Sequence, residues 1–307
     1  MKKIFKAFAL MFVAFSLNAQ SGNYNPIPCS VQGGELEPLR DLVDYNLQRQ
    51  LLKQLKSNKK WAKLIANKKM SVGLVDLRDM NNIKFARVNG DNMMYAASLP
   101  KIAVLLAAMD ALEKGELKET AAVKADMKLM IAKSNNQATT RMIDRIGFDK
   151  IEAVLTDPKY DLYNKEFGGG LWVGKRYAGG GKRKPDPLYG ISHGATVSQV
   201  CRFYYMLLHG QLVCEQRSEQ MLDIMVDPKL HHKFVNTLDR IAPDAKVYRK
   251  SGSWRNFHSD SALVWGADRQ YILVALLDDP KGESIIRRLV LEVEKVLDTN
   301  KKILAKK

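Results

Sequence analysis

The chain has 307 residues, 46% of them hydrophobic, and a formal net charge of +16 at pH 7. This length and hydrophobic content are typical of a globular protein with a large core and exclude a disordered chain. Three cysteines are too few, and odd in number, for a disulfide framework, although Cys201 and Cys214 could pair in an oxidising compartment. No Cys/His cluster has the spacing of metal ligands, so we expect no metal and no cofactor.

The N-terminus has the order of segments found in an export signal. Basic residues at positions 2, 3 and 6 precede an apolar run over residues 7–17, and the small Ala19 is followed by polar residues. The run is too short to cross a bilayer as a helix. We therefore predict a signal peptide over residues 1–19, with an N-terminal membrane anchor as the alternative. The mature chain then begins near Gln20 and is periplasmic or secreted, and we expect no stable membrane span.

The mature chain remains strongly basic. A basic surface on an exported protein suits contact with an anionic cell-wall polymer, and the alternative is a solvated surface without a dedicated partner. No basic stretch carries interleaved aromatic residues on a recognisable nucleic-acid-binding frame, so we expect no nucleic-acid partner.

The first half of the chain alternates between helical and strand patterns. Apolar residues recur every three or four positions over residues 36–65, which predicts a long amphipathic helix. Residues 72–77 and 83–88 are short β-branched runs separated by a turn signal, which predicts an antiparallel strand pair. Helices are expected again over 98–117 and 121–146, each ending near a glycine.

The second half begins with a Gly- and Pro-rich segment, residues 157–195. A loop of this length in a compact domain is usually functional or disordered. After it we expect a helix over 196–208, three strands and a final amphipathic helix from about residue 285; the strands are 246–250, 259–265 and 271–277.

This order of elements predicts a mixed α/β (α+β) fold. Strands at both ends of the chain complete one five-stranded antiparallel sheet, which is flanked by the terminal helices and has an all-helical lobe inserted between its parts. We expect one domain over residues 20–307. Its sheet lobe spans about 35–95 and 245–300, and its helical lobe about 98–244.

Three short motifs carry candidate chemistry. The first is Ser98-Leu99-Pro100-Lys101, which opens an apolar helix. Positions i and i+3 share a helix face, so the Lys101 amine can lie beside the Ser98 hydroxyl. A serine needs such a base to become nucleophilic, and a desolvated lysine can lose its proton. Alone, the motif is also satisfied by a helix-capping serine and a surface lysine.

The other two motifs follow in chain order. In Ser134-Asn135-Asn136, a hydroxyl can relay a proton and an amide can hold a substrate carbonyl; the alternative is a polar helix cap. Lys250-Ser251-Gly252-Ser253 ends a predicted strand, where an edge can offer backbone groups to an extended substrate and Lys250 can attract a carboxylate. The alternative there is an ordinary strand end with a glycine turn.

Taken together, the chain resembles the serine β-lactamases and penicillin-binding D,D-peptidases, nearest the class A type, whose motifs are Ser-x-x-Lys, Ser-x-Asn and Lys-Thr/Ser-Gly. The resemblance implies a fold of the β-lactamase/transpeptidase kind. It also implies Ser98 as the acylated nucleophile, Lys101 as its base and Ser134 as the proton shuttle. Asn136 would hold the substrate amide. The carboxylate would be bound by Lys250 and Ser251 of the motif Lys250-Ser251-Gly252-Ser253. The oxyanion would be bound by the backbone N–H groups of Ser98 and Ser253.

The chain departs from class A enzymes in one important respect. It has no Glu-x-x-Leu-Asn segment before Thr196, the family's source of the carboxylate that activates the deacylating water. Glu166 is the nearest acidic candidate, with Asp161 and Asp186 weaker, and the plain interpretation of Glu166 is a solvated loop charge.

The leading hypothesis is a monomeric, exported serine hydrolase that hydrolyses the β-lactam amide through an acyl-enzyme on Ser98. The alternatives are a D-Ala-D-Ala carboxypeptidase acting on cell-wall peptides, and a penicillin-binding sensor that is acylated without rapid turnover.

Overall fold

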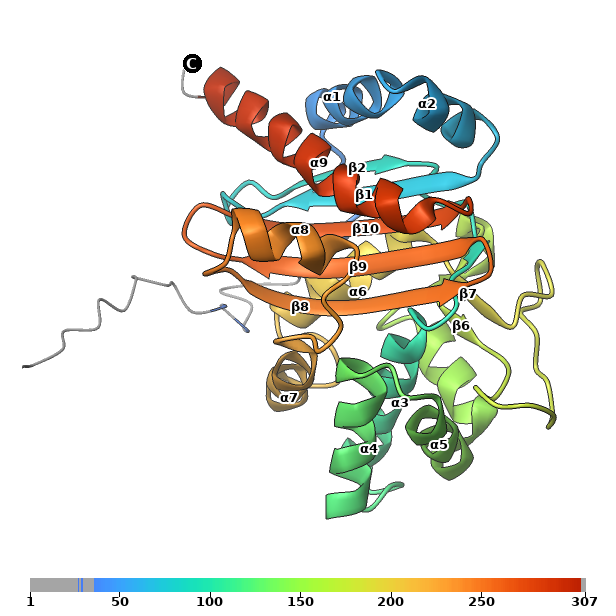
Figure 1. Cartoon of the computed structure of the whole chain (residues 1–307). Coiled ribbons are helices and arrows are strands. Elements are labelled where there is room, and N and C mark those ends of the chain that lie inside the picture. Colours follow the sequence, from blue (N-terminus) through green and yellow to red (C-terminus); the bar gives the residue numbers. More distant parts are fainter. Residues whose placement is uncertain (1–26, 28, 30–35, 305–307) are drawn as a thin grey trace, which may run out of the picture.

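The computed structural model describes residues 27, 29 and 36–304 (Figure 1). The predicted signal peptide over residues 1–19 and the expected mature start near Gln20 lie outside these residues. Within the described part, none of the helices combines the length and the apolar character that a membrane span requires.

Five antiparallel strands form the central sheet, in the order β2-β1-β10-β9-β8 (Figure 1). In that order the strands are Lys84–Val88, Met70–Asp76, Gln270–Asp278, Phe257–Trp265 and Lys246–Trp254. The N-terminal and C-terminal parts of the chain meet where β1 pairs with β10, with Met70 opposite Leu277. The sheet therefore has the composition that the sequence predicts, and β8 is one of its edge strands.

One face of the sheet is covered by α1 (Tyr45–Lys56), α2 (Lys59–Ala66), α8 (Phe234–Ile241) and α9 (Gly282–Leu304), which lie above or in front of the strands in Figure 1. The apolar stripes of these helices are buried against the strands in one cluster, which includes Leu47, Leu51, Leu55, Ile286, Leu289 and Val293. Burial of each such side chain contributes about 1.5–3 kcal/mol.

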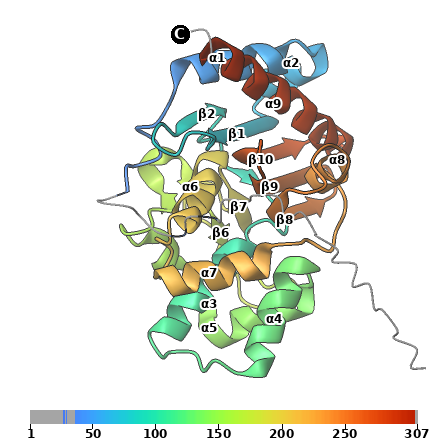
Figure 2. The same ribbon diagram turned by 90° about the vertical axis from the view of Figure 1, so that its left-hand side faces the viewer.

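The opposite face carries α6 (Val197–Leu208), with a group of helices beyond it (Figures 1 and 2). These are α3 (Lys101–Glu113), α4 (Ala121–Ala132), α5 (Asn136–Thr156) and α7 (Glu215–Met225). All residues of α3 from Lys101 to Leu112 are buried, which explains why its sequence has no polar face. The arrangement confirms the predicted fold class, with a helical part inserted between β2 and β8.

The segment between α5 and α6 is mostly irregular, as its glycines and prolines predict, but short strands organise it. One pair is β4 with β5, and β7 lies between β3 and β6. The bounds are β3 Met94–Tyr95, β4 Tyr163–Asn164, β5 Gly169–Gly170, β6 Trp172–Val173 and β7 His193–Ala195, with a 3₁₀ helix over Lys165–Phe167. Strand β7 of this loop pairs with β3, which ends at Tyr95. The pairing therefore places the loop next to the segment that leads from β3 to Ser98.

The predicted helix over residues 36–65 begins later and is broken in two. The Asp44 side chain accepts a hydrogen bond from the Leu47 N–H at 2.7 Å and so caps α1, and Asn58 caps α2 in the same way. The N–H groups in the first turn of a helix have no partner within the helix, and a capping side chain that accepts from them determines where the helix starts. The apolar period of the sequence alone does not show these starts.

Two further helix predictions were wrong in their boundaries. Helix α3 begins at Lys101 rather than Ser98 and ends at Glu113. The helix predicted over 121–146 is interrupted at Ser134, whose φ of 54° is left-handed, and α5 continues past Gly147 through a kink with φ of 78°. The helices α7 and α8 were not predicted individually.

A buried ion pair connects β8 to β9 and to the first residue of α8. The Arg249 guanidinium contacts both oxygens of Asp260 at 2.7 and 2.9 Å, and Asp260 also accepts the N–H of Phe234 at 3.0 Å. We expect Asp260→Ala to lower the free energy of unfolding by about 3–5 kcal/mol, because it leaves a buried guanidinium unpaired. In the control Lys69→Ala, which removes an exposed pair with Asp278, the loss should stay below about 1 kcal/mol. If urea unfolding gave equal losses of unfolding free energy for the two variants, the stabilising role of the buried Arg249–Asp260 pair would be contradicted.

Candidate active site

Ser98 lies in a tight turn between β3 and α3. The preceding Ala97 has a φ of 51°, and the Ala96 N–H donates to the His193 carbonyl of β7 at 2.8 Å. Gly252 of β8 is packed against this turn so closely that a Cβ there would lie 2.5 Å from the Ser98 nitrogen, which explains the glycine. Among the described contacts the Ser98 hydroxyl makes no hydrogen bond, and its side chain is only partly buried. It is therefore free to attack a substrate.

Lys101 starts α3 and is completely buried. Its Nζ donates to the Ser134 carbonyl and to Asn136 Oδ1, both at 2.7 Å, and lies 3.4 Å from Ser134 Oγ. No carboxylate of the described residues forms an ion pair with it. Burial lowers the pKa of Lys101 to about 7, because the protonated amine loses its hydration. A base with this pKa is partly neutral near physiological pH and can accept a proton from a serine.

Ser134 links Lys101 to a second buried amine. Its hydroxyl accepts a hydrogen bond from Lys250 Nζ at 2.9 Å, and the left-handed backbone at Ser134 turns the chain so that its carbonyl also faces Lys101. Burial lowers the pKa of Lys250 well below its usual range, and the neighbouring charges of Lys101 and Arg249 lower it further. The hydroxyl thus lies between two amines that hold their protons weakly, an arrangement suited to proton transfer.

The remaining residues singled out in the sequence lie around this centre. Asn136 is the first residue of α5, and because its Oδ1 accepts from Lys101, its NH₂ group is left to donate to a substrate carbonyl. The strand β8 runs past the site as an edge, with Lys250, Ser251 and Gly252 buried and Ser253 exposed at its end. An exposed edge offers unpaired backbone groups to an extended ligand.

The structure does not bring Glu166 into this site. Its side chain is exposed on the 3₁₀ helix, and the neighbouring Phe167 lies under the Arg40 guanidinium, 3.9 Å from it. The two weaker acidic candidates have structural roles: Asp186 is buried and accepts backbone N–H groups of its own loop, and Asp161 accepts from Asn164. The contacts of Asp161 and Asp186 explain these two residues without catalysis, and the exposed position of Glu166 fits a solvated loop charge.

An aromatic residue that sequence reasoning did not single out covers Lys101 on the loop side. The Tyr177 ring lies 4.6 Å from Lys101 Nζ, and its hydroxyl donates to the Ala97 carbonyl at 3.0 Å. His193 packs on Tyr177 with ring centroids 4.3 Å apart. Burial lowers the pKa of His193 to about 4, so this imidazole is neutral at pH 7. The face of Lys101 towards the loop is therefore closed by neutral rings.

Lys233 is a second residue that the sequence did not reveal. It precedes α8, is completely buried, and has a strained backbone with φ of 56°. Its Nζ donates to the Gly252 carbonyl, to Ser253 Oγ at 2.8 Å and to the Ser259 carbonyl at 3.0 Å. Burial lowers its pKa to about 8. The three donors of one ammonium group thus fix the end of β8 from behind.

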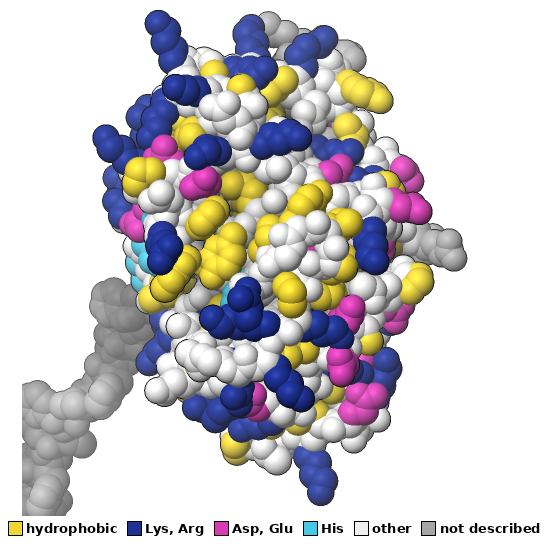
Figure 3. Space-filling view, turned by 90° about the vertical axis from the view of Figure 1, so that its right-hand side faces the viewer, with side chains coloured by type: hydrophobic (Ala, Val, Ile, Leu, Met, Phe, Trp, Pro, Cys, Tyr) yellow, Lys and Arg dark blue, Asp and Glu magenta, His cyan; other side chains and the backbone are white. Residues whose placement is uncertain are grey.

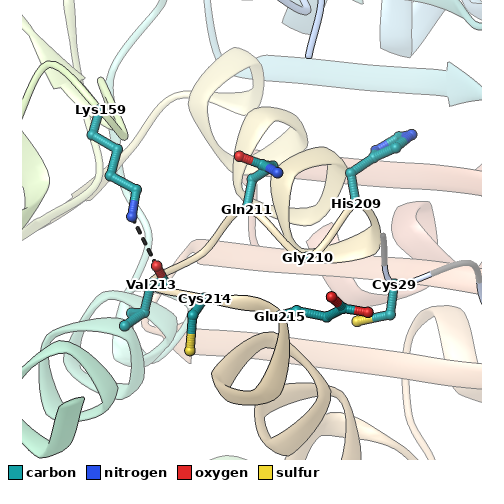
Figure 4. A pocket seen from close by; sticks show the side chains of 8 residues that line it. All are labelled: Cys29, Lys159, His209, Gly210, Gln211, Val213, Cys214 and Glu215. Carbon is teal, nitrogen blue, oxygen red and sulfur yellow. Dashed lines mark hydrogen bonds between the residues drawn. The ribbon is translucent and has the colours of Figure 1, made fainter. Parts of the chain in front are cut away.

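A separate cavity of about 240 Å³ lies near α7, and Cys29 and Cys214 are among the residues that line it (Figure 4). All three cysteines are free thiols, so Cys201 and Cys214 are not paired. Burial and nearby carboxylates, Glu219 and Glu215 among them, raise the pKa of Cys29 to about 11, which disfavours a reactive thiolate. Across the part of the chain that the structure describes, no group of His, Cys, Asp or Glu side chains has the makings of a metal site.

The fold and the site together define the class of protein. Ser-x-x-Lys, Ser-x-Asn and Lys-Ser-Gly come from three distant parts of the chain and meet beside the edge of a five-stranded sheet. This is the architecture of the superfamily of serine β-lactamases and penicillin-binding proteins.

Comparison with known proteins specifies the family. The model of the beta-lactamase enzyme family matches residues 56–128 and 119–297, so the chain belongs to this family. No curated protein sequence matches the chain.

Several solved structures share the fold. A beta-lactamase from Sphaerobacter thermophilus is 16% identical, with a TM-score of 0.60 over 83% of this chain and 96% of that one. PBP-A is 19% identical, with a TM-score of 0.61 over 83% and 97%. A representative class A beta-lactamase from Bacteroides cellulosilyticus is 17% identical, with a TM-score of 0.59 over 83% and 100%. At these identities the likeness establishes the fold.

The position of Lys233 leads to a prediction about β8. Replacing it in Lys233→Met removes the donor that holds the Gly252 carbonyl, so the N–H of Ser253 should lose its fixed direction. We expect the rate of Ser98 acylation by a penicillin to fall about tenfold, with a smaller effect on substrate binding. The matched control is Lys229→Met, an exposed lysine on the same segment. Unchanged acylation in both variants would show that Lys233 does not position the strand.

Proposed function

We propose that the protein is an exported serine hydrolase that forms an acyl-enzyme on Ser98, with a β-lactam or a peptide ending in D-Ala-D-Ala as substrate. The observation that carries this proposal is the connected set of amines and hydroxyl formed by Lys101, Ser134 and Lys250. A module that only binds cell wall does not need two buried amines with lowered pKa values beside an unengaged serine.

In the proposed reaction, neutral Lys101 accepts the proton of Ser98 while Ser98 Oγ attacks the substrate carbonyl carbon. The N–H groups of Ser98 and Ser253 hold the developing oxyanion, each contributing on the order of 3 kcal/mol to the barrier. Ser134 then delivers its proton to the leaving nitrogen as the carbon–nitrogen bond breaks. It takes a proton back from protonated Lys101, whose Nζ lies 3.4 Å from its hydroxyl, so that Lys101 becomes neutral again. Lys250 and Ser251 bind the substrate carboxylate, and Asn136 binds the carbonyl of the acyl side chain.

Hydrolysis of the resulting ester needs a water and a base on the loop side of Lys101. Tyr177 and His193 occupy that side, and neither is a carboxylate. We therefore infer slow release of a β-lactam acyl group, which favours a penicillin-sensitive D,D-peptidase over a rapid β-lactamase. A structural neighbour, a leucine-to-glutamate mutant of PBP-A, was solved as an acyl-enzyme complex with penicillin-G.

The pKa of Lys101 predicts the pH dependence of acylation. The base is active when neutral, so the acylation rate should rise with pH up to about 7 and then level off, and below that value it should fall about tenfold per pH unit. Quenched-flow intact-mass measurement with benzylpenicillin gives this profile. Ser98→Ala should abolish the adduct. Lys101→Arg, which stays protonated, should nearly abolish it at every pH. A profile without a step between pH 6 and 8 would remove Lys101 from the role of base.

The closed loop side of Lys101 predicts a long-lived adduct. After a single exposure to benzylpenicillin, we expect the Ser98 ester to persist for minutes or longer, while a chromogenic cephalosporin is consumed only stoichiometrically. Tyr177→Phe should leave the lifetime unchanged because it keeps the ring, and Tyr177→Glu should shorten it because it places a carboxylate beside Lys101.

Two other outcomes of the same experiment discriminate among the hypotheses. Catalytic loss of the cephalosporin without a trapped adduct would identify a rapid β-lactamase and contradict the inferred slow release. A stable adduct on a protein that releases no D-Ala from a D-Ala-D-Ala peptide would favour the sensor over the peptidase.

A further inference from the structure

The loop over residues 175–184 carries five cations and no carboxylate. Two of the cations are paired with α5: Arg176 with Asp144, and Lys184 with Asp149 and Glu152. The other three, Lys175, Lys182 and Arg183, form no ion pair with the residues that the structure describes. In Figure 3 a group of Lys and Arg side chains gathers near the centre of the face towards which this loop projects in Figure 1.

Two of the unpaired cations face each other across the base of the loop. Lys175 and Arg183 are opposite residues in an antiparallel bridge. The base is held in place by the Lys184 N–H, which donates to the Gly174 carbonyl at 2.7 Å, and by the Trp172 indole, which donates to the Lys184 carbonyl at 2.8 Å. Directly opposed side chains lie on one face, and like charges there are destabilising. An anion bound between them would relieve this repulsion.

This cationic pair is connected to the acylation site by a short series of contacts. The Lys175 carbonyl accepts a hydrogen bond from His193 Nε2 at 2.9 Å, and His193 packs on Tyr177. Tyr177 in turn touches both Lys101 and the carbonyl of Ala97, the residue before the nucleophile. Lys175 and Arg183 also act on His193 electrostatically, since both add to the effect of burial in lowering its pKa.

We propose that Lys175 and Arg183 bind a second carboxylate, carried by the acyl part of the substrate. This rests on the proposed function, in which Lys250 binds the first carboxylate and Ser134 protonates the leaving nitrogen. In that assignment the two groups bind the leaving-group side of the substrate. The acyl part is then placed on the other side of Ser98, past Tyr177 and towards the loop. The preferred substrates are therefore dianionic acyl donors, with an acidic group near the scissile carbonyl.

Two penicillins that differ by one carboxylate test this directly. Both benzylpenicillin and carbenicillin carry the ring carboxylate, and carbenicillin has another on its acyl side chain. The ratio of their rate constants for acylating Ser98, carbenicillin over benzylpenicillin, is measured by intact mass at low salt. We expect Lys175→Gln and Arg183→Gln each to lower this ratio about threefold or more, and 0.5 M NaCl to lower it in the wild type. Lys182→Gln, which removes an exposed cation of the same loop outside the bridge, should leave it unchanged.

Two other outcomes distinguish a failure of this inference from a failure of the proposed function. An equal ratio in the wild type and in both bridge variants, with normal benzylpenicillin acylation, would overturn the second carboxylate site alone. Absence of an adduct with both penicillins would contradict the proposed function. The non-covalent binding of the two penicillins, measured as the shift in melting temperature, would then test the second carboxylate site. A larger shift with carbenicillin than with benzylpenicillin that is lost in both bridge variants would support the site. Equal shifts with the two penicillins would overturn it.

Discussion

Two lysine amines are buried where the sheet meets the helical part, and one serine hydroxyl lies between them. Removing an ammonium group from water is costly, and a buried lysine relieves part of the cost by releasing its proton. The pKa of Lys101 is lowered by burial without an ion pair to a carboxylate. The chemistry of the site therefore follows from the packing that excludes water around α3.

That packing requires the whole topology. Lys101 belongs to α3, a helix that is buried from Lys101 to Leu112. Ser134 belongs to the break between α4 and α5, and Lys250 to an edge strand formed more than a hundred residues later. The edge strand is fixed from behind by Lys233 and by the Arg249–Asp260 pair. Such buried polar groups are costly unless every partner is present, so the site and the fold stabilise each other.

The sequence predicted the sheet, the inserted helices and the three motifs, because apolar periods and short motifs depend only on residues that are close together in the sequence. It did not predict Tyr177 or Lys233. Tyr177 lies in a loop without periodicity, and its importance comes from contact with Lys101, far away in the chain. In the sequence, Lys233 is one basic residue among many, and only the structure shows that it is buried behind Gly252. The break at Ser134 was missed because its left-handed backbone depends on tertiary contacts that override helix propensity.

The central claim is that burial makes Lys101 a base near neutral pH. The most direct measurement is an NMR titration of the lysine side chains in the Ser98→Ala protein, with the Lys101 signal assigned by its loss in a Ser98→Ala/Lys101→Arg variant. We predict that the Lys101 amine titrates with a midpoint near 7, well below the value of 10.5 for an exposed lysine. A midpoint near 10.5 would mean that Lys101 stays protonated at neutral pH, and would contradict the account of how Ser98 is activated.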